Sequence, residues 1–399
     1  MMKAGPGVHR TQLPKGFLAS GVNCGVRRYR PDMGLLISEV PAVVAGVFTL
    51  NECKAAPILY SQAILPADNI RAILTNSGQA NAATGSEGIE KNLMMVSAAA
   101  RALGCDHNQV VVASTGKIGE QLDTEKILPC MPDLVARAND FAESFATAIL
   151  TTDLVPKTVT NVINLSTGSV RITGICKGSG MIHPNMGTML GYILTDAKIT
   201  KDYALDLLKK TVDVSFNMIS VDGDSSTNDC CFIMANGASG FALETEKDVQ
   251  KFEAAFEEIA IFLAKSIAAD GEGATKLMEV QIKGSHDLAL ARKAARGITL
   301  SPLIKTAVHG EDPNWGRILA RLGAEKIPAE QLSKMTLKLQ GVLLFEKGQP
   351  VKFEKAAVKV LLKQAFVKIE INLNSGKHSA TAWGCDLSQK YVEINAEYS

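Results

Sequence analysis

Residues 177–190 read KGSGMIHPNMGTML, the most unusual stretch of the chain. Its glycines, together with Pro184 and Asn185, allow a tight loop. The apolar run from Met189 to Leu194 predicts a buried strand directly after that loop. A glycine-rich connection between two strands is the simplest interpretation. The stretch matches neither GxxxxGK[ST] nor GxGxxG, so it does not indicate a phosphate-binding loop.

Outward from this loop, short apolar segments rich in β-branched residues alternate with amphipathic helical segments, which predicts an α/β or α+β fold. Helices are expected at 88–103, closed by Gly104, at 247–269, capped by Thr245, and at 287–296. Strands are expected at 35–37, 43–50, 71–75, 110–113, 280–282, 304–308, 367–373, 379–383 and 391–395.

The composition is that of a folded protein without an excess of either charge. Its 399 residues are 46% hydrophobic, which is more than one core usually organises, so two or three lobes are expected. No stretch has the composition of a flexible linker, and the lobes should pack directly on one another. The 42 lysines and arginines are balanced by 41 aspartates and glutamates. This lack of excess positive charge argues against a nucleic acid partner.

Localisation and redox state are predicted from similar observations. The longest apolar runs are too short to cross a bilayer, so no membrane partner is expected. Residues 1–10 lack a basic segment followed by an apolar core, which favours a cytoplasmic protein over a secreted one. The eight cysteines include no CxxC pair. They are expected to be reduced thiols, with no zinc or disulfide framework.

Thr188 is the chemically interesting residue of the loop, because it begins a predicted strand directly after Gly187. A hydroxyl is a poor nucleophile until a base removes its proton. A free α-amino group, with a pKa of about 7.7 to 8.0, can be that base for its own side chain. An internal threonine has no such amine. The hypothesis of a Thr188 nucleophile therefore requires cleavage between Gly187 and Thr188, by attack of the Thr188 hydroxyl on the Gly187 carbonyl.

Several segments, taken together and in order, resemble the ornithine acetyltransferase (glutamate N-acetyltransferase) family. Each segment is a weak signal alone, but the combination is specific and covers almost the whole chain. The segments are 14–17 (PKGF), 47–51 (VFTLN), 114–116 (STG), 151–153 (TTD), 177–197, 270–273 (DGEG), 314–317 (NWGR) and 394–398 (INAEY).

This resemblance implies a self-cleaved enzyme with an N-terminal-nucleophile-like fold, a layered α/β sandwich of mixed sheets and helices. Residues 1–187 would form an α chain and residues 188–399 a β chain, assembled as an α2β2 heterotetramer. The implied reaction is ping-pong: Thr188 takes acetyl from N-acetylornithine, releases ornithine and passes the acetyl group to glutamate. Neither a metal nor an organic cofactor is implied. Some family members also use acetyl-CoA as the donor.

The site residues carry over by position in the matching segments. Thr115 and Gly116, which follow predicted strand 110–113, match the pair that forms the oxyanion hole, one hydroxyl and one backbone N–H. A cation, a carboxylate, hydroxyls and an amide suit the recognition of an N-acetyl amino acid. The positions that match substrate-binding residues are Thr151, Lys177, Thr188, Glu272 and Asn395.

Two other functions remain open at the level of the sequence. An N-terminal-nucleophile aminopeptidase or amidohydrolase would share the self-cleavage and the oxyanion hole but release its acyl group to water. An uncleaved paralogue would only bind a ligand or partner. The sequence departs from the family pattern near the cleavage position, with Gly187 where alanine is usual and His183 where a small apolar residue is usual.

Overall fold

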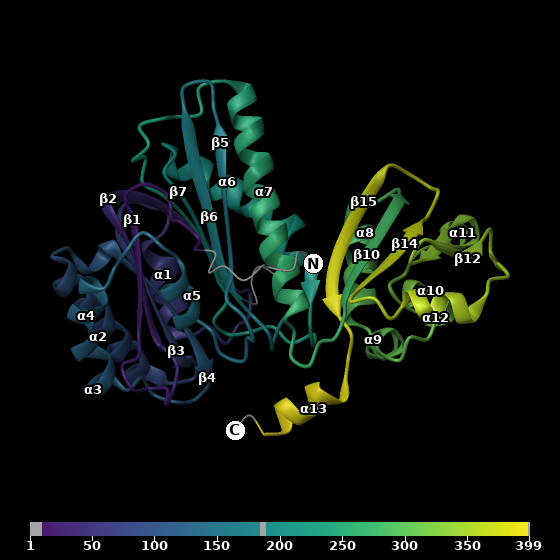
Figure 1. Ribbon diagram of the computed structural model, residues 1–399, viewed down its shortest axis with the longest axis horizontal. Helices are drawn as coiled ribbons and strands as arrows, with labels where there is room; N and C mark the ends of the chain where they lie inside the picture. The colour runs from purple at the N-terminus through teal and green to yellow at the C-terminus, as the bar shows by residue number, and fades with distance from the viewer. Residues whose placement is uncertain (1–9, 184–188, 398–399) are drawn as a thin grey trace.

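Two mixed sheets with helices between and around them form the described part of the molecule (Figure 1). The computed structural model describes residues 10–183 and 189–397. The first sheet has eight strands in the order β4-β3-β2-β9-β7-β6-β5, with β1 paired to β2. Their bounds are β1 (Phe17–Val22), β2 (Met33–Phe48), β3 (Ala67–Gln79), β4 (Val110–Lys117), β5 (Lys157–Asn164), β6 (Ser169–Lys177), β7 (Leu190–Thr195) and β9 (Cys230–Ala235).

The second sheet is built entirely from residues after the 184–188 segment. Its seven strands follow the order β13-β12-β11-β14-β10-β15-β8. They are β8 (Ile219–Ser220), β10 (Leu277–Ser285), β11 (Thr336–Leu339), β12 (Val342–Glu346), β13 (Gln349–Pro350), β14 (Phe366–Asn372) and β15 (His378–Cys385). Strand β10 pairs in parallel with β14 and antiparallel with β15.

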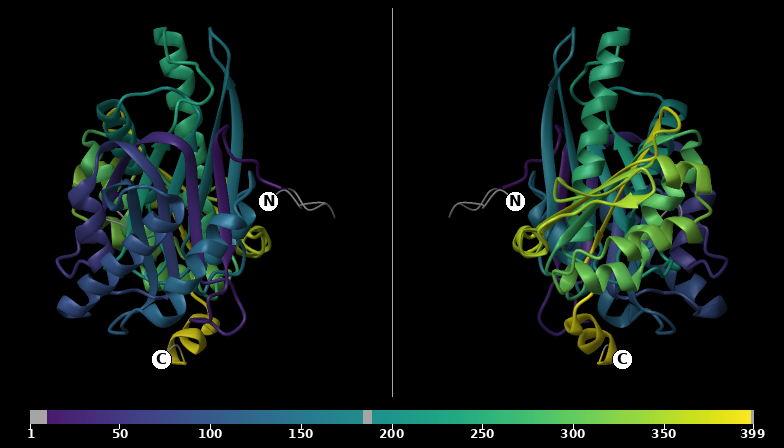
Figure 2. Two further views of the ribbon diagram at one scale, coloured as in Figure 1. Left: turned by 90° about the vertical axis from the view of Figure 1, so that its left-hand side faces the viewer. Right: turned by 90° about the vertical axis from the view of Figure 1, so that its right-hand side faces the viewer.

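The helices divide between the two sheets, as the views in Figures 1 and 2 show. Those of the N-terminal part, on β1–β4, are α1 (Ala56–Ile64), α2 (Gly85–Leu103), α3 (Thr124–Ile127), α4 (Met131–Ala136) and α5 (Glu143–Ala148). Between the sheets lie α6 (Lys201–Val214) and α7 (Glu246–Ala269). The C-terminal helices are α8 (Leu288–Leu300), α9 (Pro302–His309), α10 (Trp315–Ala324), α11 (Ala329–Lys334), α12 (Lys355–Leu361) and α13 (Gln389–Ala396).

Strands β7 and β9 form the centre of the first sheet, and every residue of both is buried. Because successive side chains of a strand point to opposite faces, the two strands supply two different cores. Tyr192 and Phe232 enter the core beneath β1, β2 and α5, whereas Ile193 and Ile233 enter the core shared with α7 and the second sheet. Helices or another sheet therefore cover both faces at this point.

Helix α7 confirms the prediction for 247–269. Thr245 caps it, accepting a hydrogen bond from the backbone N–H of Asp248, whose carboxylate reaches back to the Thr245 N–H. The apolar stripe that includes Phe252 and Phe256 is fully buried. Its burial against strands of both sheets fixes the loop that follows Ala269, which carries Glu272.

The predicted α/β architecture is confirmed, and two of the predicted strands are wrong. Residues 304–308 lie in α9, where Pro302 occupies the first turn and favours a helix start. Residues 391–395 lie in α13, a helix with no buried residue. A short apolar run cannot be assigned to strand or helix from its periodicity alone, and in both segments the local pattern was too short.

The first sheet combines strands from both sides of the predicted cleavage position. Strands β1 to β6 precede it, whereas β7 and β9 follow it. Strand β7 pairs antiparallel with β6, with Lys177 opposite Leu190, and in parallel with β9. Within the described ranges, no helix is long and apolar enough to cross a membrane.

Candidate active site

One pocket collects the predicted site residues that the structure describes. A cavity of about 150 Å³ is lined by Thr115, Gly116, Thr151, Lys177, Glu272 and Asn395, which come from before and after the 184–188 segment. Gly187 and Thr188 lie outside the described residues. Met189, the described residue directly after Thr188, lines the same cavity, and so does Ile182, which precedes His183 at the other end of the 184–188 segment.

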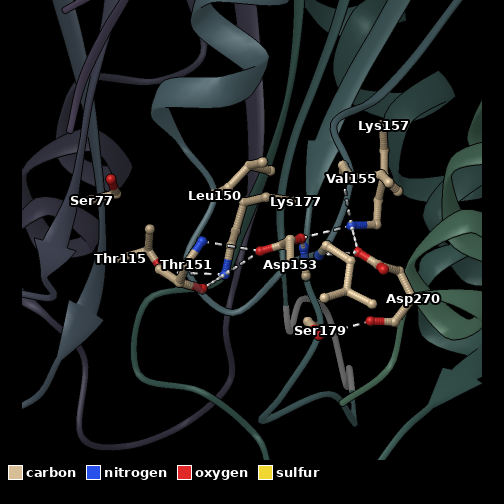
Figure 3. Close-up of polar contacts among 12 residues, drawn as sticks. Ser77, Thr115, Leu150, Thr151, Asp153, Val155, Lys157, Lys177, Ser179 and Asp270 are labelled. Carbon is tan, nitrogen blue, oxygen red and sulfur yellow. Dashed lines mark hydrogen bonds and ion pairs between the residues drawn. The ribbon is translucent and has the colours of Figure 1, made fainter. Parts of the chain in front are cut away.

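Lys177 ends strand β6 with its ammonium group inside the pocket (Figure 3). Its Nζ donates a hydrogen bond to Thr151 Oγ1 at 2.8 Å and makes a longer contact of 3.5 Å with Thr115 Oγ1. Asp153 Oδ2 lies 3.8 Å from the same nitrogen. Burial lowers the pKa of Lys177, and the Asp153 carboxylate opposes that effect. Lys177 is thus a buried cation aimed at two hydroxyls.

Thr115 and Gly116 lie in the last part of β4, which continues past the expected strand 110–113 to Lys117. Parallel pairing with β3 sets Gly116 opposite Gly78. A Cβ on Gly116 would lie 2.2 Å from the Gly78 carbonyl carbon, and the backbone φ of Gly116 is +133°. Only glycine fits this position. The Ser-Thr-Gly segment is therefore held by a sheet and not by a loop.

Glu272 and Asn395 also line the pocket, and they contact each other. Glu272 follows α7, and Asn395 of α13 donates a hydrogen bond from Nδ2 to Glu272 Oε2 at 2.8 Å. The carboxylate packs over Gly180, where a Cβ would lie 2.4 Å from Glu272 Cδ. The glycine-rich loop that follows β6 thus leaves room for the Glu272 side chain.

Asn228 and Asp229 are pocket residues that the sequence prediction missed. The amide of Asn228 is buried and donates to the carbonyl oxygens of Ala80 at 2.6 Å and Ser114 at 2.9 Å. Asn228 thereby holds the backbone next to Thr115. The available signal was a polar run, residues 225–229, directly before the buried strand that begins at Cys230.

His183 does not serve the pocket as a base in this arrangement. Its Nδ1 lies 3.1 Å from Ser220 Oγ, and an Arg296 guanidinium nitrogen lies 3.0 Å from its Nε2. An arginine only donates, so Nε2 accepts and the proton is on Nδ1. Burial, and then the charge of Arg296, lower the pKa of His183 to about 4. The imidazole is therefore neutral at physiological pH and directed at Arg296.

Metal ligation receives no support within residues 10–183 and 189–397, where no group of three or more His, Cys, Asp or Glu side chains could hold an ion. The chemistry of the pocket is that of hydroxyls, amides, one ammonium and carboxylates. Such a set can bind a zwitterionic or N-acylated amino acid and stabilise an oxyanion.

Sequence comparison with known proteins gives matches over nearly the full length of the chain. The ArgJ family model matches residues 18–399. The arginine biosynthesis bifunctional protein ArgJ of Oceanobacillus iheyensis is 44% identical over 388 residues, covering 96% of this chain and 95% of that protein. Its counterpart from Thermotoga neapolitana is 44% identical over 393 residues, covering 97% and 99%. The crystal structure of arginine biosynthesis bifunctional protein argJ from Bacillus halodurans matches with a TM-score of 0.50 at 38% identity, covering 52% of this chain and 99% of that one.

Proposed function

The chain belongs to the ArgJ family, and we propose on this premise that it transfers acetyl from N-acetylornithine to glutamate through an acetyl ester on Thr188. The observation that carries the proposal is the pocket. It gathers Lys177, Glu272 and Asn395 with Thr115 and Gly116, and its lining includes Met189, which directly follows Thr188 in the sequence.

The enzyme first makes its own nucleophile. The Thr188 hydroxyl attacks the Gly187 carbonyl, the peptide bond to the Thr188 nitrogen breaks, and an ester forms. Water then hydrolyses this ester, leaving a carboxylate on Gly187 and a free α-amino group and hydroxyl on Thr188. The α-amine, with an ordinary pKa of about 7.7 to 8.0, is then the base for the hydroxyl.

Acetyl transfer follows in two steps. The Thr188 oxygen attacks the acetyl carbonyl of N-acetylornithine while its proton passes to the α-amine. The tetrahedral intermediate collapses, the proton moves to the departing nitrogen, and ornithine leaves the acetyl ester behind. The amino group of glutamate then attacks the ester carbonyl, and N-acetylglutamate leaves as the Thr188 hydroxyl is restored. Each step builds negative charge on the carbonyl oxygen.

The oxyanion is the charge that the pocket is proposed to stabilise. Because the ammonium of Lys177 donates toward Thr115 Oγ1 and Thr151 Oγ1, the hydroxyl protons of both threonines are left to point elsewhere. The Thr115 hydroxyl and the Gly116 N–H would then donate to the developing oxyanion. Removal of one such donor typically costs on the order of 100- to 1000-fold in kcat.

The substrates differ in their distal charge, which is positive in ornithine and negative in glutamate. The pocket lining includes both the Lys177 ammonium and the Glu272 carboxylate, so groups of either sign have a partner of opposite charge. Glu272 is held by the Asn395 amide, which favours a fixed position for that carboxylate.

Further properties belong to the same proposal. We propose cleavage into an α chain, 1–187, and a β chain, 188–399, an α2β2 assembly, no metal or organic cofactor, cytoplasmic localisation, and a second activity with acetyl-CoA as donor. Relatives named as bifunctional support the second activity. The Bacillus halodurans chain, which matches 52% of this one over nearly its whole length, supports a division into halves.

The assay that tests the reaction compares N-acetylornithine turnover with and without glutamate. Acetyl transfer gives N-acetylglutamate in the complete mixture and little steady release of acetate without the acceptor. The rival hydrolase, an N-terminal-nucleophile aminopeptidase or amidohydrolase, would release acetate at the same rate in both mixtures, and that result would overturn the transferase.

The mass of the denatured protein tests the nucleophile. Two fragments meeting at Gly187 and Thr188 are expected from the wild type, and one intact, inactive chain is expected from Thr188→Ala. Normal fragments from Thr188→Ala would show that another group cleaves the chain. A single intact chain from the wild type would favour the binding-only paralogue.

A further inference from the structure

Two buried lysines and two buried carboxylates form a network behind the pocket wall (Figure 3). Lys157 Nζ lies 2.7 Å from Asp153 Oδ1 and 2.6 Å from Asp270 Oδ2. Lys177 Nζ joins from the pocket side, 3.8 Å from Asp153 Oδ2. The side chains of Asp153 and Lys157 are 0% and 2% exposed. Buried charges of this kind persist only when they are paired, so the arrangement is a balanced set.

Asp153 occupies the central position of this network. Besides both lysines, it accepts hydrogen bonds from the backbone N–H of Thr151 at 3.1 Å and of Gly178 at 2.7 Å. Thr151 and Lys177, the neighbour of Gly178, are both pocket residues. One carboxylate therefore contacts the backbone of two segments that contribute to the pocket, together with the ammonium of Lys177.

Asp270 binds the other end of the network. Its carboxylate pairs with Lys157 and accepts from the backbone N–H of Leu154, and its carbonyl accepts from Ser179 Oγ at 2.7 Å. These contacts attach the end of α7 to the first sheet. Besides burial, the charges with the largest effects on the pKa of Lys177 are those of Asp153, Lys157, Asp229 and Glu272. Among the described residues, Asp270 forms its ion pair with Lys157 and none with Lys177.

We propose that Asp153 is a positioning residue for acetyl transfer, which keeps Lys177 charged and directed at Thr151 and Thr115. The carboxylate does not line the cavity and acts through Lys177. This inference rests on the role of Lys177 in the proposed function. Asp153 would thus belong to the site although it does not touch the substrate, because it keeps Lys177 charged.

Asp153 and Lys157 act on the pKa of Lys177 in opposite directions, so the proposal predicts the direction in which each substitution shifts the pH dependence. Burial lowers the pKa of Lys177, Asp153 raises it and Lys157 lowers it. An ammonium is present below its pKa and is lost as the pH rises through that value. We call the decline of kcat/KM at high pH the alkaline limb. Removing Asp153 should therefore move this limb to lower pH, and removing Lys157 should move it to higher pH.

The experiment measures kcat/KM for N-acetylornithine against pH, at saturating glutamate, with the cleaved full-length enzyme. For Asp153→Asn we expect the alkaline limb at lower pH and a loss in kcat/KM on the order of 10- to 100-fold at pH 8, as is typical when a reacting group is misplaced. For Lys157→Met we expect the limb at higher pH. Asp153→Glu, which keeps the charge, should restore the limb to the wild-type pH.

Asp270→Asn is the matched control, since it removes a carboxylate from the same network at the end remote from Lys177. Its unfolding temperature should fall while its alkaline limb stays at the wild-type pH. If the network were purely structural, all variants would be less stable. The alkaline limbs of Asp153→Asn and Lys157→Met would then not shift in opposite directions.

Three outcomes decide the proposal. A wild-type limb in folded, cleaved Asp153→Asn would overturn it. If Asp153→Asn yields no folded protein, Lys157→Met decides, and an unchanged or lowered limb there overturns it. Wild-type kcat/KM in Lys177→Met would instead remove the assumed role of Lys177, whatever the other variants show.

Discussion

At the scale of single residues, Gly116 is a position where adding a single methyl group would disturb the proposed oxyanion hole. Its φ of +133° lies in a region that side chains rarely adopt, and a Cβ would meet the backbone of Gly78 at 2.2 Å. Any larger residue must push β4 away from β3, and the proposed oxyanion donor is on this backbone.

For Gly116→Ala we expect kcat to fall at least about 100-fold, the typical loss of an oxyanion donor. Gly119→Ala is the matched control, because Gly119 also has positive φ, +84°, but nothing lies within 4 Å of its Cβ position. Steady-state kinetics with N-acetylornithine and glutamate, with circular dichroism to confirm folding, is the measurement. Equal kcat values for the two variants would contradict the prediction.

His183 makes a prediction about stability and pH. Its pKa in the folded protein, about 4, lies below the ordinary 6.5, so the unfolded chain takes up the proton first as the pH falls. The stabilisation that the neutral imidazole contributes above pH 6.5 is therefore lost between about 6.5 and 4. The imidazole of His183 contacts Ser220 and Arg296, and the charge of Asp224 also acts on its pKa.

We expect the unfolding temperature of the wild type to fall more steeply over this pH range than that of His183→Ala. Differential scanning calorimetry of both proteins from pH 7.5 to 4.5 makes the comparison, and the difference between the curves cancels the other titrating groups. Parallel curves would mean that His183 is as easily protonated in the folded as in the unfolded protein.

At the scale of elements, α13 stands apart because it closes the pocket without burying any residue. Polar contacts attach it to the loop after α7: Ser388 Oγ donates to the Gly273 carbonyl at 2.6 Å, and Asn395 Nδ2 to Glu272. Such a helix adds little apolar burial to stability, so its contribution should appear in substrate binding.

Asn395→Ala should raise KM by about 10-fold, the equivalent of one hydrogen bond to a charged group, while the unfolding temperature changes little. Lys390→Ala serves as the control on the same helix, since it removes an exposed ion pair with Glu393, and neither residue is among those that line the pocket. Steady-state KM values and thermal melts for both variants give the answer. A large drop in the melting temperature of Asn395→Ala would assign Asn395 to folding instead.

The elements also show where sequence patterns suffice. The 247–269 helix carries a cap and an apolar stripe several turns long, and both signals are local, so its position was predicted to within one residue. The apolar run at 304–308 is too short to show a period, and the decisive signal is Pro302 before it. The 391–395 segment has a neighbour in the tertiary structure, Glu272, that no local pattern contains.

At the scale of the whole molecule, the first sheet joins the two proposed chains. Strand β6, which precedes the 184–188 segment, pairs through residues 172–177 with all of β7, which follows it. Both large cores take residues from before and after it, such as Ile172 with Ile193 in one and Phe145 with Tyr192 in the other. Separating the chains would expose these cores and open a central sheet.

We therefore expect the cleaved fragments to behave as one particle. Native size-exclusion chromatography should give a single peak that contains both fragments, at the elution volume of uncleaved Thr188→Ala, and the fragments should separate only in denaturant. Fragments that separate under native conditions would show that the sheet does not hold across the cleavage position.

The sequence by itself determined the α/β class, the long capped helix and the residues that carry hydroxyl, ammonium, carboxylate and amide groups, because these depend on local pattern and on the matching segments. Only the tertiary structure decided that Thr115, Lys177, Glu272 and Asn395 share one pocket, that Gly116 is confined by β3, and that Asp153 and Asn228 support the wall. Strand order and helix packing bring distant segments together, and the local sequence of one segment does not determine which other segment packs against it.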